Sequence, residues 1–205
     1  MKRMAWLLAC VLALALGISD GVFAGEPEGE IEVGEVRYNG SGCPQGTAEL
    51  IVAQDGKSFS LVFNEFAALA GPGIPLAQSR RNCVVNFSAR VPEGFTWGVG
   101  GVRFQGLAKI AGGGTGLHTT TYFVQGQAQQ ATSSHQFMSP FQGSWSHSDE
   151  FDADDALFVP CGLQRSFNIN TSLRVSAGND PNDRVSFAMM RTEQVFQLLV
   201  KRCPS

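Results

Sequence analysis

The stretch RSFNINTSLRVS, residues 165–176, alternates apolar and polar side chains along almost its whole length. Phe167, Ile169, Thr171, Leu173 and Val175 fall on one side of an extended chain, and the residues between them are polar or charged. Successive side chains of a β-strand point to opposite faces of its sheet, so this period of two predicts a strand with one buried face and one wet face.

The same alternation recurs from residue 31 to residue 201, and turns rich in Gly, Pro, Asn and Asp separate the runs. The alanine-rich segment 65–70 is the one place where we expect a single helical turn. About ten strands predict an all-β protein, an antiparallel two-sheet β-sandwich of jelly-roll-like form. The other predicted strands are 31–38, 47–53, 59–63, 85–91, 95–99, 102–110, 119–127, 141–147, 184–190 and 194–201.

Residues 1–24 have the pattern of a secretory signal peptide. Lys2 and Arg3 precede a run of about 13 mostly apolar residues, and Val22-Phe23-Ala24 is typical of a cleavage site. The run is shorter than the roughly 20 residues that span a bilayer, so no transmembrane segment is predicted. Cleavage before Cys10 with lipidation of that cysteine is an alternative. We expect residues 25–205 to form a single domain that is secreted and extracellular, with the periplasm as another destination.

Four cysteines remain after the signal peptide is removed, and an even number in an exported chain favours two disulfides. Four cysteines allow three pairings, and their distribution favours Cys43 with Cys83 and Cys161 with Cys203. Each such loop of about 40 residues would add roughly 3–4 kcal/mol to stability on the chain-entropy model. A zinc site is disfavoured because the chain lacks a close C-x-x-C pair. The three histidines, His118, His135 and His147, are also far apart in the sequence.

The chain has a formal net charge of −3. Nucleic acids and anionic membrane surfaces attract basic proteins, so this mild acidity argues against both as partners. We expect a monomer whose partner is an extracellular glycan or another surface component.

The cysteine contexts and several glycine-rich and proline-rich landmarks occur in a characteristic order. Together they resemble a family of secreted proteins known as domain of unknown function 4360. The resemblance covers nearly all of the chain after residue 24, and it implies an extracellular disulfide-bonded β fold but supplies no catalytic or binding residues. The landmarks are residues 40–47, 59–66, 71–73, 79–83, 92–95 and 160–162.

An acidic segment at 149–155 could supply oxygen ligands to Ca²⁺, the one cofactor that the sequence suggests. The candidate ligands are Asp149, Asp152, Asp154 and Asp155. The segment lacks the glycine and the distal glutamate of an EF-hand loop, and a solvated surface loop is the alternative interpretation.

Three aromatic residues give a binding hypothesis. Trp97, Tyr122 and Trp145 lie in or near predicted strands, where exposed rings could form a platform for sugar stacking. Trp97 alternates with Phe95 and Val99, which favours a place in the core. Trp145 lies between two serines, so it is the one we expect to be exposed.

The sequence therefore favours a non-catalytic extracellular binding module, with calcium as a candidate ligand ion. A small extracellular hydrolase is the alternative, and it would need a cleft with His147 or paired carboxylates. No G-x-S-x-G nucleophile motif supports that alternative. A structural role in a cell envelope or spore surface is a third possibility.

Overall fold

The computed structural model describes residues 31–151, 156–179, 182, 184–188 and 192–204. The predicted signal peptide lies outside these residues, as do Asp152, Asp154 and Asp155 of the acidic segment.

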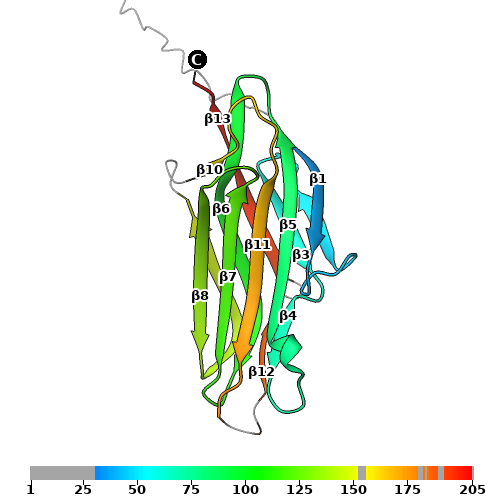
Figure 1. The fold of residues 1–205 in the computed structure, drawn as a ribbon, viewed down its shortest axis with the longest axis vertical. Coiled ribbons are helices and arrows are strands. Elements are labelled where there is room, and N and C mark those ends of the chain that lie inside the picture. Colours follow the sequence, from blue (N-terminus) through cyan, green and yellow to red (C-terminus); the bar gives the residue numbers. More distant parts are fainter. Residues whose placement is uncertain (1–30, 152–155, 180–181, 183, 189–191, 205) are drawn as a thin grey trace, which may run out of the picture.

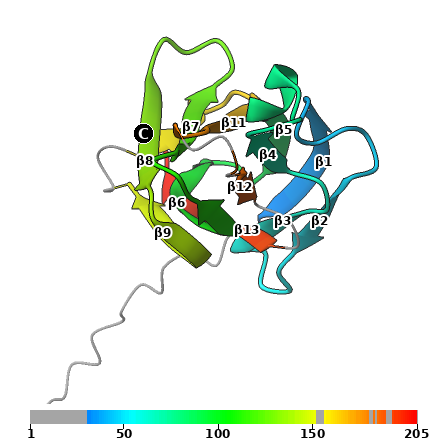
Figure 2. The same ribbon diagram turned by 90° about the horizontal axis from the view of Figure 1, so that it is seen from below.

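Two antiparallel sheets pack face to face, which confirms the predicted β-sandwich (Figures 1 and 2). Strand β6 also pairs with two strands outside the linear order of the second sheet. The five-stranded sheet has the order β1(Glu32–Asn39), β5(Arg80–Arg90), β11(Phe167–Ser176), β7(Thr115–Val124), β8(Gln130–Met138). The eight-stranded sheet has the order β2(Ala48–Val52), β3(Ser58–Phe63), β13(Thr192–Arg202), β6(Phe95–Ile110), β12(Val185–Ala188), β4(Ala67–Ala70), and β6 also pairs with β9(Phe141–Glu150) and β10(Leu157–Phe158).

The core lies between the two sheets, where the apolar side of each alternating strand is buried. In β11 the side chains of Phe167, Ile169 and Leu173 are buried, as the alternation in 165–176 predicts. The Phe59 ring on the facing sheet stacks with Phe196 and meets Phe87 edge-on, with ring centroids 4.6 Å apart in both pairs. Apolar alternation thus fixes which side of each strand faces the core.

Both predicted disulfides are confirmed. Cys43 pairs with Cys83, and Cys161 pairs with Cys203. The first joins the segment before β2 to β5, so it ties the chain leading into one sheet to a strand of the other. The second joins the loop after β10 to the end of β13.

Several elements differ from the sequence predictions. Residues 95–99 and 102–110 belong to one continuous strand, β6, because the chain stays extended through Gly100 and Gly101. The alanine-rich segment 65–70 contains strand β4, which pairs with β12, in place of the expected helical turn. Residues 130–138 form β8, a strand that the sequence analysis does not predict.

Strand β8 was missed because both of its faces are largely polar. Its inward positions include Ser133 and His135, so apolar and polar residues do not alternate there.

One 3-10 turn, Leu76–Ser79, is present in the described part of the chain. Among the described residues, no helix is both long and apolar enough to cross a membrane.

Candidate functional site

The three aromatic side chains proposed as a stacking platform lie in the core. The exposed fractions are 3% for Trp97, 0% for Tyr122 and 6% for Trp145. Trp97 therefore lies in the core, as its alternation with Phe95 and Val99 favours. The expectation that Trp145 is exposed is wrong. Trp145 turns inward over Gly106, where an added Cβ would lie only 2.4 Å from two atoms of the indole ring. Because Gly106 has no side chain, the ring can pack against the strand, and Ser144 and Ser146 face outward in its place.

Asp149, the first of the predicted calcium ligands, lies in β9 rather than in a loop, and its carboxylate faces the interior. Oδ2 accepts a hydrogen bond from the Tyr122 hydroxyl at 2.8 Å, and Oδ1 accepts one from Ser133 at 2.5 Å. The His135 Nε2 atom lies 3.0 Å from the same Oδ1. Asp149 therefore belongs to a strand and points inward, which corrects the prediction that it is part of a calcium-binding segment. Calcium binding by Asp152, Asp154 and Asp155, outside the described residues, stays a prediction.

These contacts shift the pKa values of the buried groups. Burial by itself would raise the pKa of Asp149, but hydrogen bonds from Ser133, His135 and Tyr122 outweigh it, and the net shift is downward. The pKa of Tyr122 is raised, first by burial and then by the adjacent Asp149 carboxylate. Asp149 is therefore an ionised acceptor and Tyr122 a neutral donor at ordinary pH.

The three histidines come together although they are distant in the sequence. The β7–β8 hairpin places His118 directly opposite His135, and His147 reaches them from β9 of the other sheet. His118 Nδ1 lies 3.0 Å from His147 Nε2, and the His135 and His147 rings stack with centroids 3.5 Å apart. Burial, followed by the neighbouring His147, lowers the pKa of His118 to about 3. Burial, followed by His135, lowers the pKa of His147 to about 4.

Ser133, His135 and Asp149 do not form the relay of a hydrolase in this geometry. The same nitrogen of His135, Nε2, contacts both the Ser133 hydroxyl and the Asp149 carboxylate. A catalytic triad uses one ring nitrogen for the nucleophile and the other for the carboxylate. Among the described residues, no group of three or more His, Cys, Asp or Glu side chains is arranged to hold a metal ion. The arrangement instead forms a polar hydrogen-bonded network inside the sandwich.

The outer face of the five-stranded sheet carries a different kind of chemistry. In Figure 1 the strands β8, β7, β11 and β5 lie side by side, and their sheet faces the viewer. Their outward side chains are mostly hydroxyls and amides, and they align in rows across the strands. We call this surface the polar face. One row contains Asn82, Ser172, Thr119 and Ser134, and the next contains Val84, Asn170, Thr121 and Thr132.

Hydrogen bonds hold several of these side chains in place. The hydroxyls of Thr121 and Thr132 are 3.1 Å apart. The Asn86 amide donates to Asn168 Oδ1 at 2.7 Å in the third row. That row also contains Phe123, whose partly exposed ring lies on the outward side of β7 between two buried residues. Sequence reasoning missed the polar face, although the T-x-T and T-x-S spacings at 119–121 and 132–134 place hydroxyls on one side of adjacent strands.

A hollow of about 360 Å³ lies on the polar face. Hydroxyl and amide side chains from three strands border it, and one aliphatic side chain and two arginines complete the border. The lining residues are Arg80, Asn82, Leu117, Thr119, Thr121, Asn170, Ser172 and Arg174.

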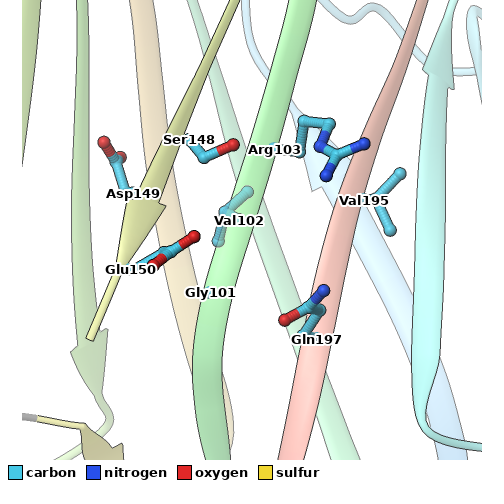
Figure 3. Close-up of a pocket in the computed structure, with 8 residues that line it drawn as sticks. All are labelled: Gly101, Val102, Arg103, Ser148, Asp149, Glu150, Val195 and Gln197. Atoms are coloured by element: carbon cyan, nitrogen blue, oxygen red, sulfur yellow. The ribbon is translucent and has the colours of Figure 1, made fainter. Parts of the chain in front are cut away.

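A smaller hollow of about 150 Å³ lies on the eight-stranded sheet, between β9, β6 and β13 (Figure 3). Arg103, Gln197 and Glu150 surround Gly101 there, and Asp149 lies on the other side of β9 from Ser148 and Glu150. This hollow is less than half the size of the hollow on the polar face and lacks rows of matched hydroxyl and amide groups. The polar face is therefore a stronger candidate for a binding site than this hollow.

Comparison with known proteins finds a family model, a secreted relative and a solved structure that are similar to this chain. A family model described as "Domain of unknown function (DUF4360)" matches residues 29–203. An uncharacterised secreted protein of Arthroderma benhamiae is 30% identical over 155 residues, which cover 76% of this chain and 63% of that protein. The chain thus spans less than two thirds of that relative.

A solved structure of a family 11 carbohydrate-binding module from Clostridium thermocellum, in complex with a β-1,3-1,4-mixed-linked tetrasaccharide, is also similar to this chain. It is 9% identical, with a TM-score of 0.23, over 85% of this chain and 91% of that chain. A similarity this low carries no functional argument. Since the family model spans both sheets and all four paired cysteines, the chain belongs to the domain of unknown function family DUF4360.

Proposed function

We propose that this protein is a secreted, non-catalytic module that binds an extracellular polysaccharide on the polar face. The observation that supports this is the hollow of about 360 Å³ bordered by Asn82, Thr119, Thr121, Asn170 and Ser172. Hydroxyls both donate and accept hydrogen bonds, and amides offer separate donor and acceptor atoms. A surface of this kind matches the hydroxyls of sugars, which also donate and accept.

The position of these groups on strands favours binding over loose surface solvation. Each side chain projects from a sheet whose register is fixed by the buried opposite face, so little conformational freedom is lost when a ligand binds. The rows from Arg80 to Asn86 span seven residues of β5, and the six rises between them make a length of about 20 Å. A face of this length fits a short run of sugar units rather than a single monosaccharide.

Apolar groups are interspersed in the face. Leu117 borders the hollow, Val84 is 38% exposed, and Phe123 is partly exposed in the third row. The C–H faces of sugar rings pack against such groups, and aromatic rings are the preferred partners. Phe123 is thus the aromatic ring that would stack on a sugar, a role that the sequence predicts for Trp97, Tyr122 and Trp145.

The test is binding of the secreted, oxidised protein to a panel of soluble polysaccharides by isothermal titration calorimetry. Thr121→Ala with Asn170→Ala removes one cross-strand pair of the polar face. Each lost hydrogen bond is worth about 0.5–1.5 kcal/mol, so the double variant should bind roughly tenfold more weakly.

Gln105→Ala with Ser146→Ala is the matched control, because it removes an exposed cross-strand pair from the outer face of the other sheet. The control should bind as the wild type does. Equal losses in both double variants, or binding that neither variant changes, would contradict the proposal. Melting temperatures of the variants verify that each remains folded.

A further inference from the structure

Two arginines lie side by side at one end of the polar face. Arg80 on β5 and Arg174 on β11 are direct cross-strand partners, both are exposed, and both border the hollow. Side chains in such positions have Cβ atoms about 4.5–5.5 Å apart, and like charges there destabilise a sheet. None of the ion pairs between described residues includes Arg80 or Arg174. The pair is therefore a repulsive arrangement that an anionic ligand would relieve.

Other arginines on this sheet are already engaged. The Arg90 guanidinium lies 3.7 Å from the Glu32 carboxylate, and Arg37 lies 2.7 Å from Glu35. Arg81 donates a hydrogen bond to the backbone carbonyl of Ser41. Arg80 and Arg174 thus differ from their neighbours in facing the hollow without a protein acceptor among the contacts described.

The four strands that form the polar face add no negative charge. The segments that form β5, β7, β8 and β11 contain no Asp or Glu, although acidic residues outnumber basic ones by 18 to 15 in the whole chain. The polar face is therefore electropositive on a protein whose net charge is −3. A positive local potential attracts anions to this face, whereas the net negative charge of the whole protein does not attract them.

We propose that the polar face selects an acidic polysaccharide, and that Arg80 and Arg174 together bind an anionic group carried on its sugars. This inference rests on the proposed function of the same face and names its class of ligand. A guanidinium presents its N–H donors in a planar fork that matches a carboxylate or a sulfate, and two of them can hold one anion from both sides. The adjacent Asn82 and Ser172, one row further along, would then bind hydroxyls of the same sugar unit or the next.

A polysaccharide fits the face better than a nucleic acid, the other common polyanion. Nucleic-acid binding requires neutralisation of many phosphates by a broad basic surface. Here two arginines stand at one end of a face whose remaining groups are neutral donors and acceptors. That combination matches a chain whose units carry hydroxyls beside an anionic group.

The experiment measures affinity by calorimetry for four polymers at low salt. Polygalacturonate carries carboxylates, dextran sulfate carries sulfates, dextran is neutral, and a single-stranded oligothymidylate supplies phosphates. The variants are Arg80→Gln with Arg174→Gln and, as the matched control, Arg103→Gln, which removes an exposed arginine from the hollow on the other sheet. Melting temperatures report whether each variant remains folded.

We expect the wild type to bind at least one acidic polysaccharide ten or more times more tightly than dextran, and added salt should weaken this binding. The comparison of polygalacturonate with dextran sulfate identifies the anionic group. The double variant should lose at least tenfold in affinity for the acidic polymer, and Arg103→Gln should lose none.

Three outcomes would overturn the inference in distinguishable ways. If dextran binds as tightly as the acidic polymers, the protein binds polysaccharides as proposed but does not select acidic ones. Tighter binding of the oligothymidylate than of the acidic polysaccharides would show that the ligand is a nucleic acid and not a polysaccharide. Absence of binding to all four polymers would contradict both the inference and the proposed function.

Discussion

His118 and His147 belong to opposite sheets, and their ring atoms Nδ1 and Nε2 lie 3.0 Å apart inside the sandwich. The other nitrogen of His118 contacts the hydroxyls of Thr171 and Thr120, at 2.9 and 3.1 Å. The His118 ring is buried and the His147 ring is partly buried, so protonating either one would place a positive charge where solvation is poor. The contact therefore links the folded structure to the neutral form of both histidines.

The free energy of unfolding should fall when the pH falls below about 6.5. The pKa values of His118 and His147 are about 3 and about 4 in the folded protein, below the ordinary value of 6.5. The unfolded chain therefore binds more protons between these values, and stability decreases as the pH falls through that window.

His118 by itself should contribute a slope of about 1.4 kcal/mol per pH unit. Urea unfolding at pH 7, 6 and 5 measures the slope, and His118→Gln should reduce it. A free energy of unfolding that stays constant from pH 7 to pH 4.5 would show that the histidines are not held neutral.

Tyr122→Phe should destabilise the protein by about 1–3 kcal/mol. The substitution removes the donor to Asp149 Oδ2 and leaves a buried acceptor without it, while the shape of the ring is kept. The double-mutant cycle with Asp149→Asn isolates the coupling between the two side chains. Thr132→Val, which removes a hydroxyl from the exposed face of β8, serves as the control and should change stability by less than about 0.5 kcal/mol. Additive effects of the Tyr122 and Asp149 substitutions would argue against the interior hydrogen bond.

Calcium binding by the acidic segment can be separated from the structural role of Asp149. If Asp152 and Asp154 hold the ion, Ca²⁺ raises the melting temperature relative to EDTA, and Asp152→Asn with Asp154→Asn abolishes that rise. Asp149→Asn should lower the melting temperature both with Ca²⁺ and with EDTA, since its carboxylate accepts interior hydrogen bonds. Equal melting temperatures of the wild type in Ca²⁺ and EDTA would remove the calcium prediction.

The sequence predicted the fold class because most strands have one apolar side. The alternation in residues 165–176 became β11 with the predicted side buried, and the two disulfides paired as the distribution of the cysteines favoured. Strand β8 was not predicted because its inward side chains include the polar residues Ser133 and His135, whose hydrogen-bond partner Asp149 lies on β9.

The candidate site was harder to predict than the fold for a related reason. Trp145 has polar neighbours on both sides, and only its cross-strand partner Gly106 shows that the ring packs inward. The histidines are far apart in the sequence, and the pairing of His118 with His135 depends on the register of a hairpin. The rows of the polar face likewise depend on strand order, since β11 lies between β5 and β7 although it comes later in the chain.

The central claim is that ligand binds the polar face, and backbone amide chemical shifts of the isotope-labelled protein test it most directly. During titration with an acidic oligosaccharide, the account predicts the largest shifts at Thr119, Thr121, Asn170 and Ser172, followed by Arg80 and Arg174. Shifts confined to the outer face of the eight-stranded sheet, around Arg103 and Gln197, would contradict the account.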